Sequence, residues 1–302
     1  MIITSANLKS LNKGFNVLFD EAYHGAGAKP LVDTFAMRST STSAEELYGW
    51  LAAVPGLREL LGEVVIRNLA DLNYSIKNRE FESTIGVKRK DIERDNFGMY
   101  NMLFTAMGAS AANHPDELMF ELLAGGFTNL CYTGKNFFDT NHEPIKGKTK
   151  FSNKGTKKLS ATNYEVARAN IKSRLNTAGR PMNLGRDLVL VVSPDYESTG
   201  RSIVVADKVG GGNDNVNKGT ARLEVCPLLA ASPHNWFLLD VGYVIKPFIN
   251  QIELEAEFVS VTDPASEHAL LKKEWLYQAY RRGNVGFGLP EVAYGSTGAD
   301  AA

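Results

Sequence analysis

The sequence has only two cysteines in 302 residues, too few for a disulfide-rich scaffold or for a zinc site built from several cysteines. Cys131 and Cys226 lie far apart in the chain, and neither belongs to a Cys-x-x-Cys pair. We therefore expect neither a disulfide-stabilised scaffold nor a cysteine-based zinc site, and a reducing compartment is the expected environment. Both thiols are predicted to be small, buried, apolar side chains.

The chain also lacks an excess of charge and a long apolar run. Its 33 lysines and arginines nearly balance 34 acidic residues, so no global field attracts it to nucleic acid or to an anionic membrane. The densest apolar run, Leu188–Val192, has the length of a buried strand, whereas a membrane span needs ~20 residues. The N-terminus shows no secretion-signal pattern. A composition of 44% hydrophobic and 22% charged residues is typical of a folded globular chain.

Motifs for phosphate binding and nucleophilic catalysis are absent as well. The glycine-rich stretch Gly210 to Gly219 lacks the glycine spacing of a nucleotide cradle, and this favours a mobile loop. The best catalytic candidate is the set Asp139, His142 and Glu143, because carboxylates and imidazole ligate divalent metals and relay protons. The same segment also suits a turn held by side-chain to backbone hydrogen bonds, and we favour this interpretation. A metal-dependent hydrolase remains the alternative function.

The N-terminal third combines an irregular segment with two periodic ones. Residues 1–44 follow neither a helical nor a strand period and predict an extended arm. From Glu45 to Leu61 apolar residues recur at steps of three and four, which predicts an amphipathic helix interrupted at Pro55. Apolar and polar residues then alternate on both sides of the charged run Lys77 to Glu80, which predicts a projecting β-hairpin.

The central part of the chain predicts two helices and a basic segment. One helix covers about 97–125, restarts at Pro115 and stops at a glycine pair. The other begins with a capping box at Thr162 and ends at Gly179. Lys146 to Lys158 contains six lysines and no acid. It is either a phosphate-contacting loop of a nucleic-acid-binding module or a solvated linker, and we favour the linker.

The remainder predicts strands, several with one buried and one solvated face. The expected strands are 188–193, 222–228, 236–240 and 252–258, followed by a hairpin of 275–280 and 285–287 joined through 281–284.

The predicted arm and hairpin are too long to lie flat on one body of this size. Their apolar residues therefore need a cover, and copies of the same chain are the simplest one, through added strands and interlocked arms. Apolar and aromatic side chains are expected to dominate the affinity, and charged ones to set the register. The predicted contact residues are Phe15 and Phe19 on the arm, and Leu72, Tyr74, Ile76, Lys77, Arg79, Glu80, Phe81 and Glu82 on the hairpin.

The order of arm, hairpin, long helix and mixed α/β region resembles the Johnson fold of tailed-phage major capsid proteins, an α+β architecture. Several stretches further resemble the Mu-like prophage major head subunit family. They occur in the same order along the chain and are densest over residues 1–145. These stretches are Trp50 to Arg58, Tyr74 to Glu82, Val87 to Glu93, His114-Pro115 and Cys131 to His142.

The resemblance implies five segments. They are an N-terminal arm with a short helix at 1–62, an extended loop at 63–96, a spine helix with the first part of a peripheral domain at 97–154, an axial domain at 155–245, and peripheral-domain strands with a C-terminal tail at 246–302. In such subunits a loop of the axial domain lies at the centre of the capsomer. The corresponding residues here are Gly210, Gly211, Gly212, Asn213, Asp214 and Asn215.

The implied function is self-assembly into the hexamers and pentamers of an icosahedral shell that encloses phage double-stranded DNA. Such a protein needs no enzymatic activity and no cofactor. The implied partners are further copies of the chain, a separate scaffolding protein, a portal, a decoration protein and non-specifically contacted DNA, with no membrane partner. The implied location is the virion, and the host cytoplasm during assembly.

Overall fold

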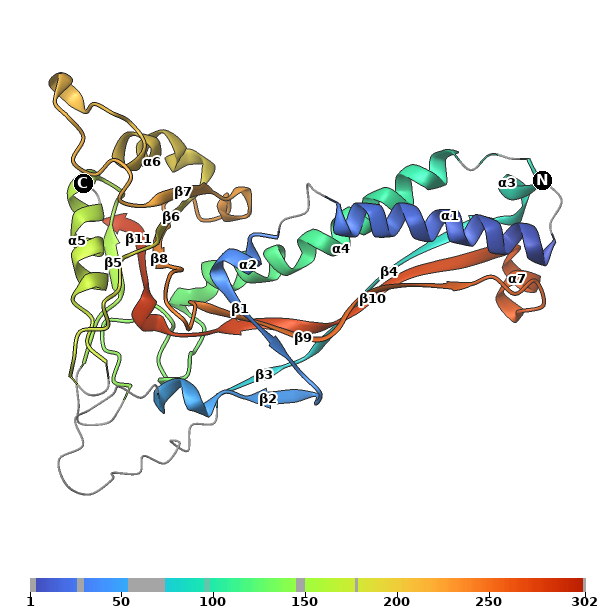
Figure 1. The fold of residues 1–302 in the computed structure, drawn as a ribbon, viewed down its shortest axis with the longest axis horizontal. Helices are drawn as coiled ribbons and strands as arrows, with labels where there is room; N and C mark the ends of the chain where they lie inside the picture. Colours follow the sequence, from blue (N-terminus) through green and yellow to red (C-terminus); the bar gives the residue numbers. More distant parts are fainter. Residues whose placement is uncertain are drawn as a thin grey trace.

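The computed structural model describes residues 4–25, 30–53, 74–94, 96, 98–144, 150–176 and 179–300. Their helices and strands form two parts (Figure 1). One part is a long ribbon of strands with two helices alongside it, and the other is a lobe in which a second sheet packs with short helices. The chain starts near the far end of the ribbon and finishes in the lobe.

The first element is a helix, α1 (Ser5–His24), which lies along helix α4 (Gly98–Ala124). Apolar residues at helical spacing, including Phe15 and Phe19, face inward from α1. The extended arm predicted for residues 1–44 is therefore wrong over α1. Its helical period is present in the sequence, but the polar residues of the exposed face and the irregular segment that follows dilute it.

Helix α4 is the longest element in the described chain, with 27 residues. It contains Pro115, so the predicted restart at this proline falls within one continuous helix. It ends where the glycine pair predicts, before the 3-10 turn η2 (Gly125–Phe127). The contact between α1 and α4 is close enough to require a glycine, because a Cβ at Gly108 would collide with the carbonyl oxygen of Phe19.

Four strands form the ribbon, in the order β1-β9-β10-β4. Strand β1 is parallel to β9, and the other neighbours are antiparallel. The hairpin predicted within 275–287 is wrong, since this segment is one continuous strand that pairs with β9 through a bulge near Arg281. The strands are β1 (Ala36–Thr40), β9 (Phe248–Val261), β10 (Glu274–Phe287) and β4 (Arg79–Lys88).

Two short strands beside the ribbon correct the predicted hairpin. Strand β3 (Ser75–Lys77) pairs with β2 (Glu45–Leu47), whereas β4 pairs with β10, so β3 and β4 are not partners of each other. Period-2 alternation identified both strands, but it carries no information about which partner each strand takes. The helix predicted from Glu45 to Leu61 starts as strand β2 and continues as a 3-10 turn, η1 (Gly49–Ala53). The rest of that segment lies outside the described residues.

The lobe contains a five-stranded sheet of order β5-β11-β8-β6-β7. The strands predicted at 188–193, 222–228 and 236–240 are confirmed as three neighbours in it. Strand β11 comes from the end of the chain and joins this sheet, not the ribbon. The strands are β5 (Lys154–Lys157), β11 (Ala293–Asp300), β8 (Trp236–Asp240), β6 (Leu188–Val192) and β7 (Arg222–Val225).

The second predicted helix is α5 (Ala161–Lys172), although its ends differ from the prediction. Ser160 is the N-cap, and its hydroxyl accepts a hydrogen bond from the Asn163 N–H at 3.2 Å. Thr162 therefore lies inside the first turn. The helix stops at Lys172, before the predicted Gly179.

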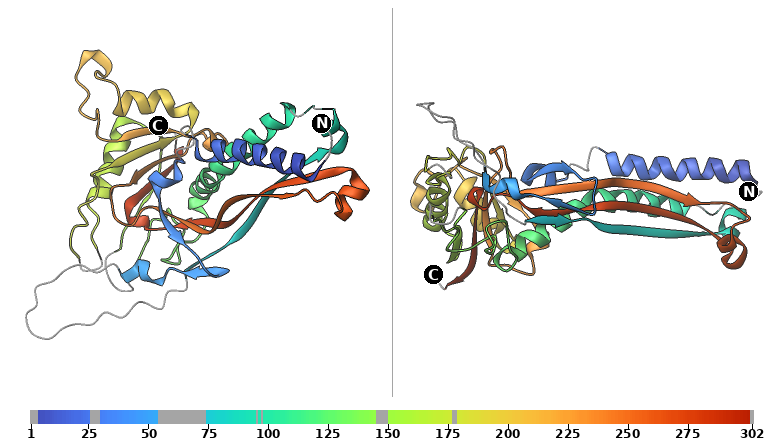
Figure 2. Two further views of the ribbon diagram at one scale, coloured as in Figure 1. Left: turned by 45° about the vertical axis from the view of Figure 1, so that its right-hand side comes forward. Right: turned by 90° about the horizontal axis from the view of Figure 1, so that it is seen from below.

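The remaining elements are short and are distributed over both parts. The helices are α2 (Val32–Phe35), α3 (Arg89–Glu93), α6 (Glu197–Val204) and α7 (Glu267–Lys272), and the 3-10 turns are η3 (Pro194–Tyr196), η4 (Gly210–Gly212), η5 (Pro227–Leu229) and η6 (Pro290–Val292). Helix α7 lies at the tip of the ribbon, far from the lobe in all views (Figures 1 and 2). None of the described helices is long and apolar enough to cross a lipid bilayer.

The buried apolar residues form a core that extends through both parts. One cluster joins α1 and α4 to the ribbon through Phe15, Phe104 and Tyr277. The other two lie on the sheet of the lobe and reach the base of the ribbon, around Trp236 and Phe237. Cys131 and Cys226 are buried free thiols, as predicted.

Candidate functional site

The apolar residues of the predicted hairpin are already covered by the chain itself. Ile76 is buried and contacts Gly286 of β10. The hydroxyl of Tyr74 accepts a hydrogen bond from the Phe287 N–H at 2.7 Å, and burial raises the pKa of this tyrosine. The prediction that Tyr74 and Ile76 need a neighbouring copy as cover is therefore wrong. Leu72 lies outside the described residues.

Phe81 is half-buried and packs within the chain as well. Its ring lies edge-on to that of His114, with centroids 4.2 Å apart, and the Arg79 guanidinium lies 5.0 Å from the ring centroid. The charged residues of this segment are different, because they are exposed. They are Lys77, Arg79, Glu80 and Glu82.

The two predicted arm contacts are also internal. Phe15 packs against Phe104 and Tyr277, with ring centroids 4.3 and 5.3 Å apart, and Phe19 packs against Phe258 at 5.2 Å. Both phenylalanines are fully buried. The prediction that a neighbouring copy covers them fails, because α1 folds back onto α4 and the ribbon.

The exposed apolar side chains lie elsewhere on the ribbon part. Three of them, Met99, Met102 and Leu103, lie on α4, although Tyr100 and Phe104 of the same helix are buried. A helix with apolar residues on opposite faces is typical of an element that is covered on both sides. This distribution was visible in the sequence and could have identified the surface. The other large exposed apolar residues of this part are Val17 on α1, Leu47 on β2, Val259 and Val261 on β9, and Leu270 and Leu271 on α7.

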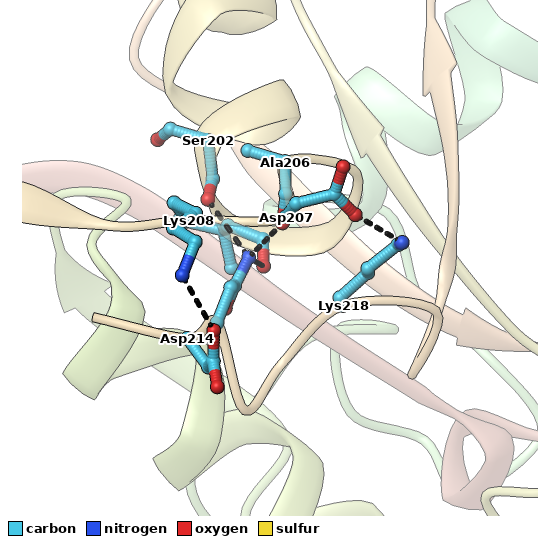
Figure 3. Close-up of polar contacts among 8 residues, drawn as sticks. Ser202, Ala206, Asp207, Lys208, Asp214 and Lys218 are labelled. Carbon is cyan, nitrogen blue, oxygen red and sulfur yellow. Dashed lines mark hydrogen bonds and ion pairs between the residues drawn. The ribbon is translucent and has the colours of Figure 1, made fainter. Parts of the chain in front are cut away.

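The predicted axial loop is fixed at its base and exposed at its tip. At the base the Asn215 side-chain amide donates to the carbonyl oxygens of Ser202, Ile203 and Ala206, at 3.1, 3.0 and 2.9 Å. Ion pairs then join Lys208 to Asp214 and Lys218 to Asp207 (Figure 3).

At the tip of the loop the turn Gly210–Gly212 is exposed. Gly211 and Gly212 both have φ of +80°, a conformation that favours glycine. The arrangement presents a polar loop at the end of the lobe without a packed core behind its tip.

The alternative metal site is a hydrogen-bonded turn. His142 is fully buried, with Nδ1 2.9 Å from the Thr133 hydroxyl and Nε2 3.1 Å from Asn153 Oδ1, so both ring nitrogens have protein partners. Burial lowers the pKa of His142 to about 4. Asp139 accepts a hydrogen bond from the Asn141 N–H at 2.8 Å, as the turn interpretation predicts, and Glu143 lies 3.8 Å from Lys150. The described residues contain no cluster of three potential metal ligands.

The basic segment is partly a strand. Lys154 and Lys157 delimit β5, which pairs in parallel with β11, so the linker prediction is wrong there. The Lys154 ammonium lies 5.8 Å from the centroid of the Phe127 ring. Residues 145–149 lie outside the described part of the chain.

Comparison with known proteins identifies what kind of subunit carries these surfaces. The family model described as "Mu-like prophage major head subunit gpT" matches residues 8–156, 149–229 and 230–300. The major capsid protein of Escherichia phage Mu is 28% identical over 293 residues, which cover 97% of this chain and 74% of that protein.

Solved capsid structures agree with this match. A chain of the bacteriophage JBD30 procapsid is 31% identical and superimposes with a TM-score of 0.62, covering 97% of this chain and 76% of that chain. A chain of the JBD30 capsid decorated with minor capsid protein trimers is 28% identical with a TM-score of 0.57, covering 76% of this chain and 100% of that chain. These neighbours confirm the predicted α+β Johnson fold. The chain therefore belongs to the Mu-like prophage major head subunit family, the major capsid proteins of Mu-like phages.

Proposed function

We propose that many copies of this chain form the hexamers and pentamers of a closed icosahedral shell around phage double-stranded DNA. The observation that carries the proposal is the uncovered apolar surface of the ribbon part. Met99, Met102 and Leu103 on α4 and Leu270 and Leu271 on α7 are all exposed, although the same part contains a buried apolar cluster that joins α1 and α4 to the ribbon. Exposed apolar surface of this kind is typical of protein interfaces.

Assembly of such a shell requires only weak individual contacts. Each subunit touches several neighbours at once, so the free energies of the contacts combine multivalently. A formal net charge of −1 limits the repulsion between copies at close range. The exposed Lys77, Arg79, Glu80 and Glu82 are proposed to set the register between neighbours, with ~0–1 kcal/mol for each exposed ion pair.

We assign the parts of the subunit by analogy with the family. The lobe would be the axial domain, with residues 210–215 at the centre of the capsomer, and it would include β11 in addition to the predicted 155–245. The ribbon with α4 would be the peripheral domain and spine, and residues 63–96 the extended loop. The chain would act in the virion, after assembly in the host cytoplasm, and without enzymatic activity.

Further partners are proposed on the same basis. The JBD30 capsid is decorated with minor capsid protein trimers, and a decoration protein of this type would bind shells of this chain as well. A separate scaffolding protein and a portal would direct assembly, and packaged DNA would be contacted without sequence preference.

The size of the purified protein tests the proposal. Light scattering and negative-stain electron microscopy should detect capsomer rings or closed particles of megadalton mass. The same preparation should contain no stoichiometric metal and no hydrolase activity. A protein that remains a monomer or dimer at every concentration and salt condition would contradict the proposal.

A further inference from the structure

Arg281 is a buried cation that has no acidic partner among the described residues. It lies on β10, and only 6% of its surface is exposed. Among the described residues its side chain makes one hydrogen bond, from Nη1 to Nδ1 of His114 at 3.2 Å. Burial, together with the charges of Arg281 and Arg79, lowers the pKa of His114 to about 4, so this imidazole is neutral near pH 7. The guanidinium charge is therefore not balanced by any of the residues that the structure describes.

A recess of about 400 Å³ lies beside Arg281, lined by residues of α1, α2, α4, β1 and β9. Two carboxylates line it. Glu255 is already bound by Arg38 and by the Tyr23 hydroxyl, which donates to it at 3.2 Å. No ion pair joins Asp33 to Arg281 in the described part of the chain. The recess thus contains a buried cation that neither of the two lining carboxylates pairs with in the described part of the chain.

The wall of the recess also contains an unpaired acceptor. Asn250 lies on β9 and is 5% exposed, and its Oδ1 is buried without a hydrogen-bond partner among the described residues. Buried polar atoms normally have partners, so this oxygen and the Arg281 guanidinium both point to something that occupies the recess.

The two groups together define the chemistry of the occupant. A guanidinium pairs best with a carboxylate, through two parallel hydrogen bonds, and an amide oxygen accepts a hydrogen bond from an N–H. A peptide segment with an aspartate or glutamate supplies the carboxylate from its side chain and the N–H from its backbone. A phosphate supplies acceptors only, and the nearby Glu255 and Asp33 would repel its higher charge.

We propose that this recess binds an acidic segment of a second copy of this chain, whose carboxylate pairs with Arg281 and whose backbone N–H bonds to Asn250. The inference rests on the proposed assembly function, which supplies neighbouring copies at high local concentration. It assigns opposite effects to Arg281 before and after assembly. In the free subunit the unpaired buried charge is destabilising, whereas between subunits the same charge contributes a contact.

Arg281→Met separates these two effects, because methionine fills similar space without the charge. The midpoint of thermal unfolding of the unassembled variant should equal or exceed that of the wild type. The protein concentration needed for particle formation, followed by light scattering, should rise at least tenfold. As a matched control, Arg222→Met removes an exposed guanidinium that is paired with Asp187. This variant should change the unfolding midpoint by less than about 2 °C and the concentration needed for particle formation by less than about twofold, as expected of a surface substitution.

Two results would overturn the inference. One is a lower unfolding midpoint or misfolding of the Arg281→Met subunit, which would show that Arg281 is paired within the chain. The other is particle formation by Arg281→Met at the wild-type concentration. If the wild type itself forms no particles, the proposed function fails instead, so the two failures are distinguishable.

Sodium succinate tests the chemistry of the occupant directly. Compared with sodium chloride at equal ionic strength, it should raise the unfolding midpoint of unassembled wild type but not of Arg281→Met, and it should inhibit wild-type assembly by competition. If succinate stabilises the wild type but Arg281→Met assembles normally, the occupant is a free carboxylate and not a segment of a second copy. An equal effect of sodium phosphate would overturn the preference for a carboxylate.

Discussion

The two parts of the subunit bury their strands to different extents. In the lobe, every residue of β6 and β8 is buried, so both faces of the sheet are covered by the chain. In the ribbon, β10 alternates between buried and half-exposed residues over most of its length. Helices α1 and α4 cover one face, and the other face remains accessible. The central strands of the lobe are therefore fully covered within one chain, whereas the ribbon presents a face on which other chains can pack.

The comparison predicts that the largest loss of subunit stability comes from the core of the lobe. Trp236→Ala removes a fully buried indole whose Nε1 donates to the Lys157 carbonyl oxygen at 2.9 Å. We expect a loss of ~3–5 kcal/mol in the free energy of unfolding, measured by denaturant titration. Val244→Ala, at a residue that is 89% exposed in the same lobe, is the control and should be neutral. Equal stability of the two variants would contradict a complete lobe core.

Acid should destabilise the segment around His142, which joins the ribbon part to the lobe. Burial lowers the pKa of His142 to about 4 from an unfolded value of 6.5, so the unfolded chain binds the proton first as the pH falls. The buried, uncharged His142 therefore makes its full contribution to the free energy of unfolding above pH 6.5. This contribution is lost progressively between pH 6.5 and 4, by up to ~3 kcal/mol. Unfolding measured across this range should show the slope. His142→Gln should reduce it, and an unchanged slope would exclude His142 as its source.

The close packing of α1 on α4 gives a prediction for the ribbon part. Gly108→Ala places a Cβ against the Phe19 carbonyl and should cost ~1–3 kcal/mol, because backbone atoms cannot yield as a flexible side chain does. Gly98→Ala is the matched control on the same helix, since a Cβ there meets open space. Limited proteolysis of α1, together with thermal unfolding, measures the effect. If Gly108→Ala and Gly98→Ala are equally stable, the helices are not in tight contact.

The smallest effect on the free subunit is expected from the exposed face. Met99→Ser combined with Met102→Ser should change the free energy of unfolding by less than ~0.5 kcal/mol, because both side chains are more than half exposed. The same double variant should form fewer particles, as counted by negative-stain microscopy. Thr105→Ser, at an exposed polar position of the same helix, is the control. Normal particle numbers would remove this face from the interface.

Several elements could be predicted from the sequence because their signals are local. Strands β6 and β8 were found from short apolar runs, and the end of α4 from its glycine pair. The turn at Asp139 was recognised from side chains that bond to the neighbouring backbone. Each of these depends on residues within a few positions of one another.

Several of the errors concern partners that lie far apart in the chain. Alternation in the segments now seen as β3 and β4 was correct, but their partners β2 and β10 come from distant parts of the sequence. Residues 281–284 have the composition of a turn, yet pairing with β9 keeps them in a strand. Phe15 and Phe19 needed a cover, as predicted, but the cover is the chain's own α4 and ribbon.

The sequence by itself determined the α+β composition, the order of segments and the membership of a capsid family, because these depend on local periodicity and on short stretches that can be read one after another. Only the tertiary structure decided which apolar residues remain available to other copies. Exposure is a property of what packs on a residue, and α1 covers Phe15 while Met102 of the neighbouring helix α4 is left uncovered. The unpaired charge of Arg281 emerged in the same way, since its burial is visible only after β10 and α4 are brought together.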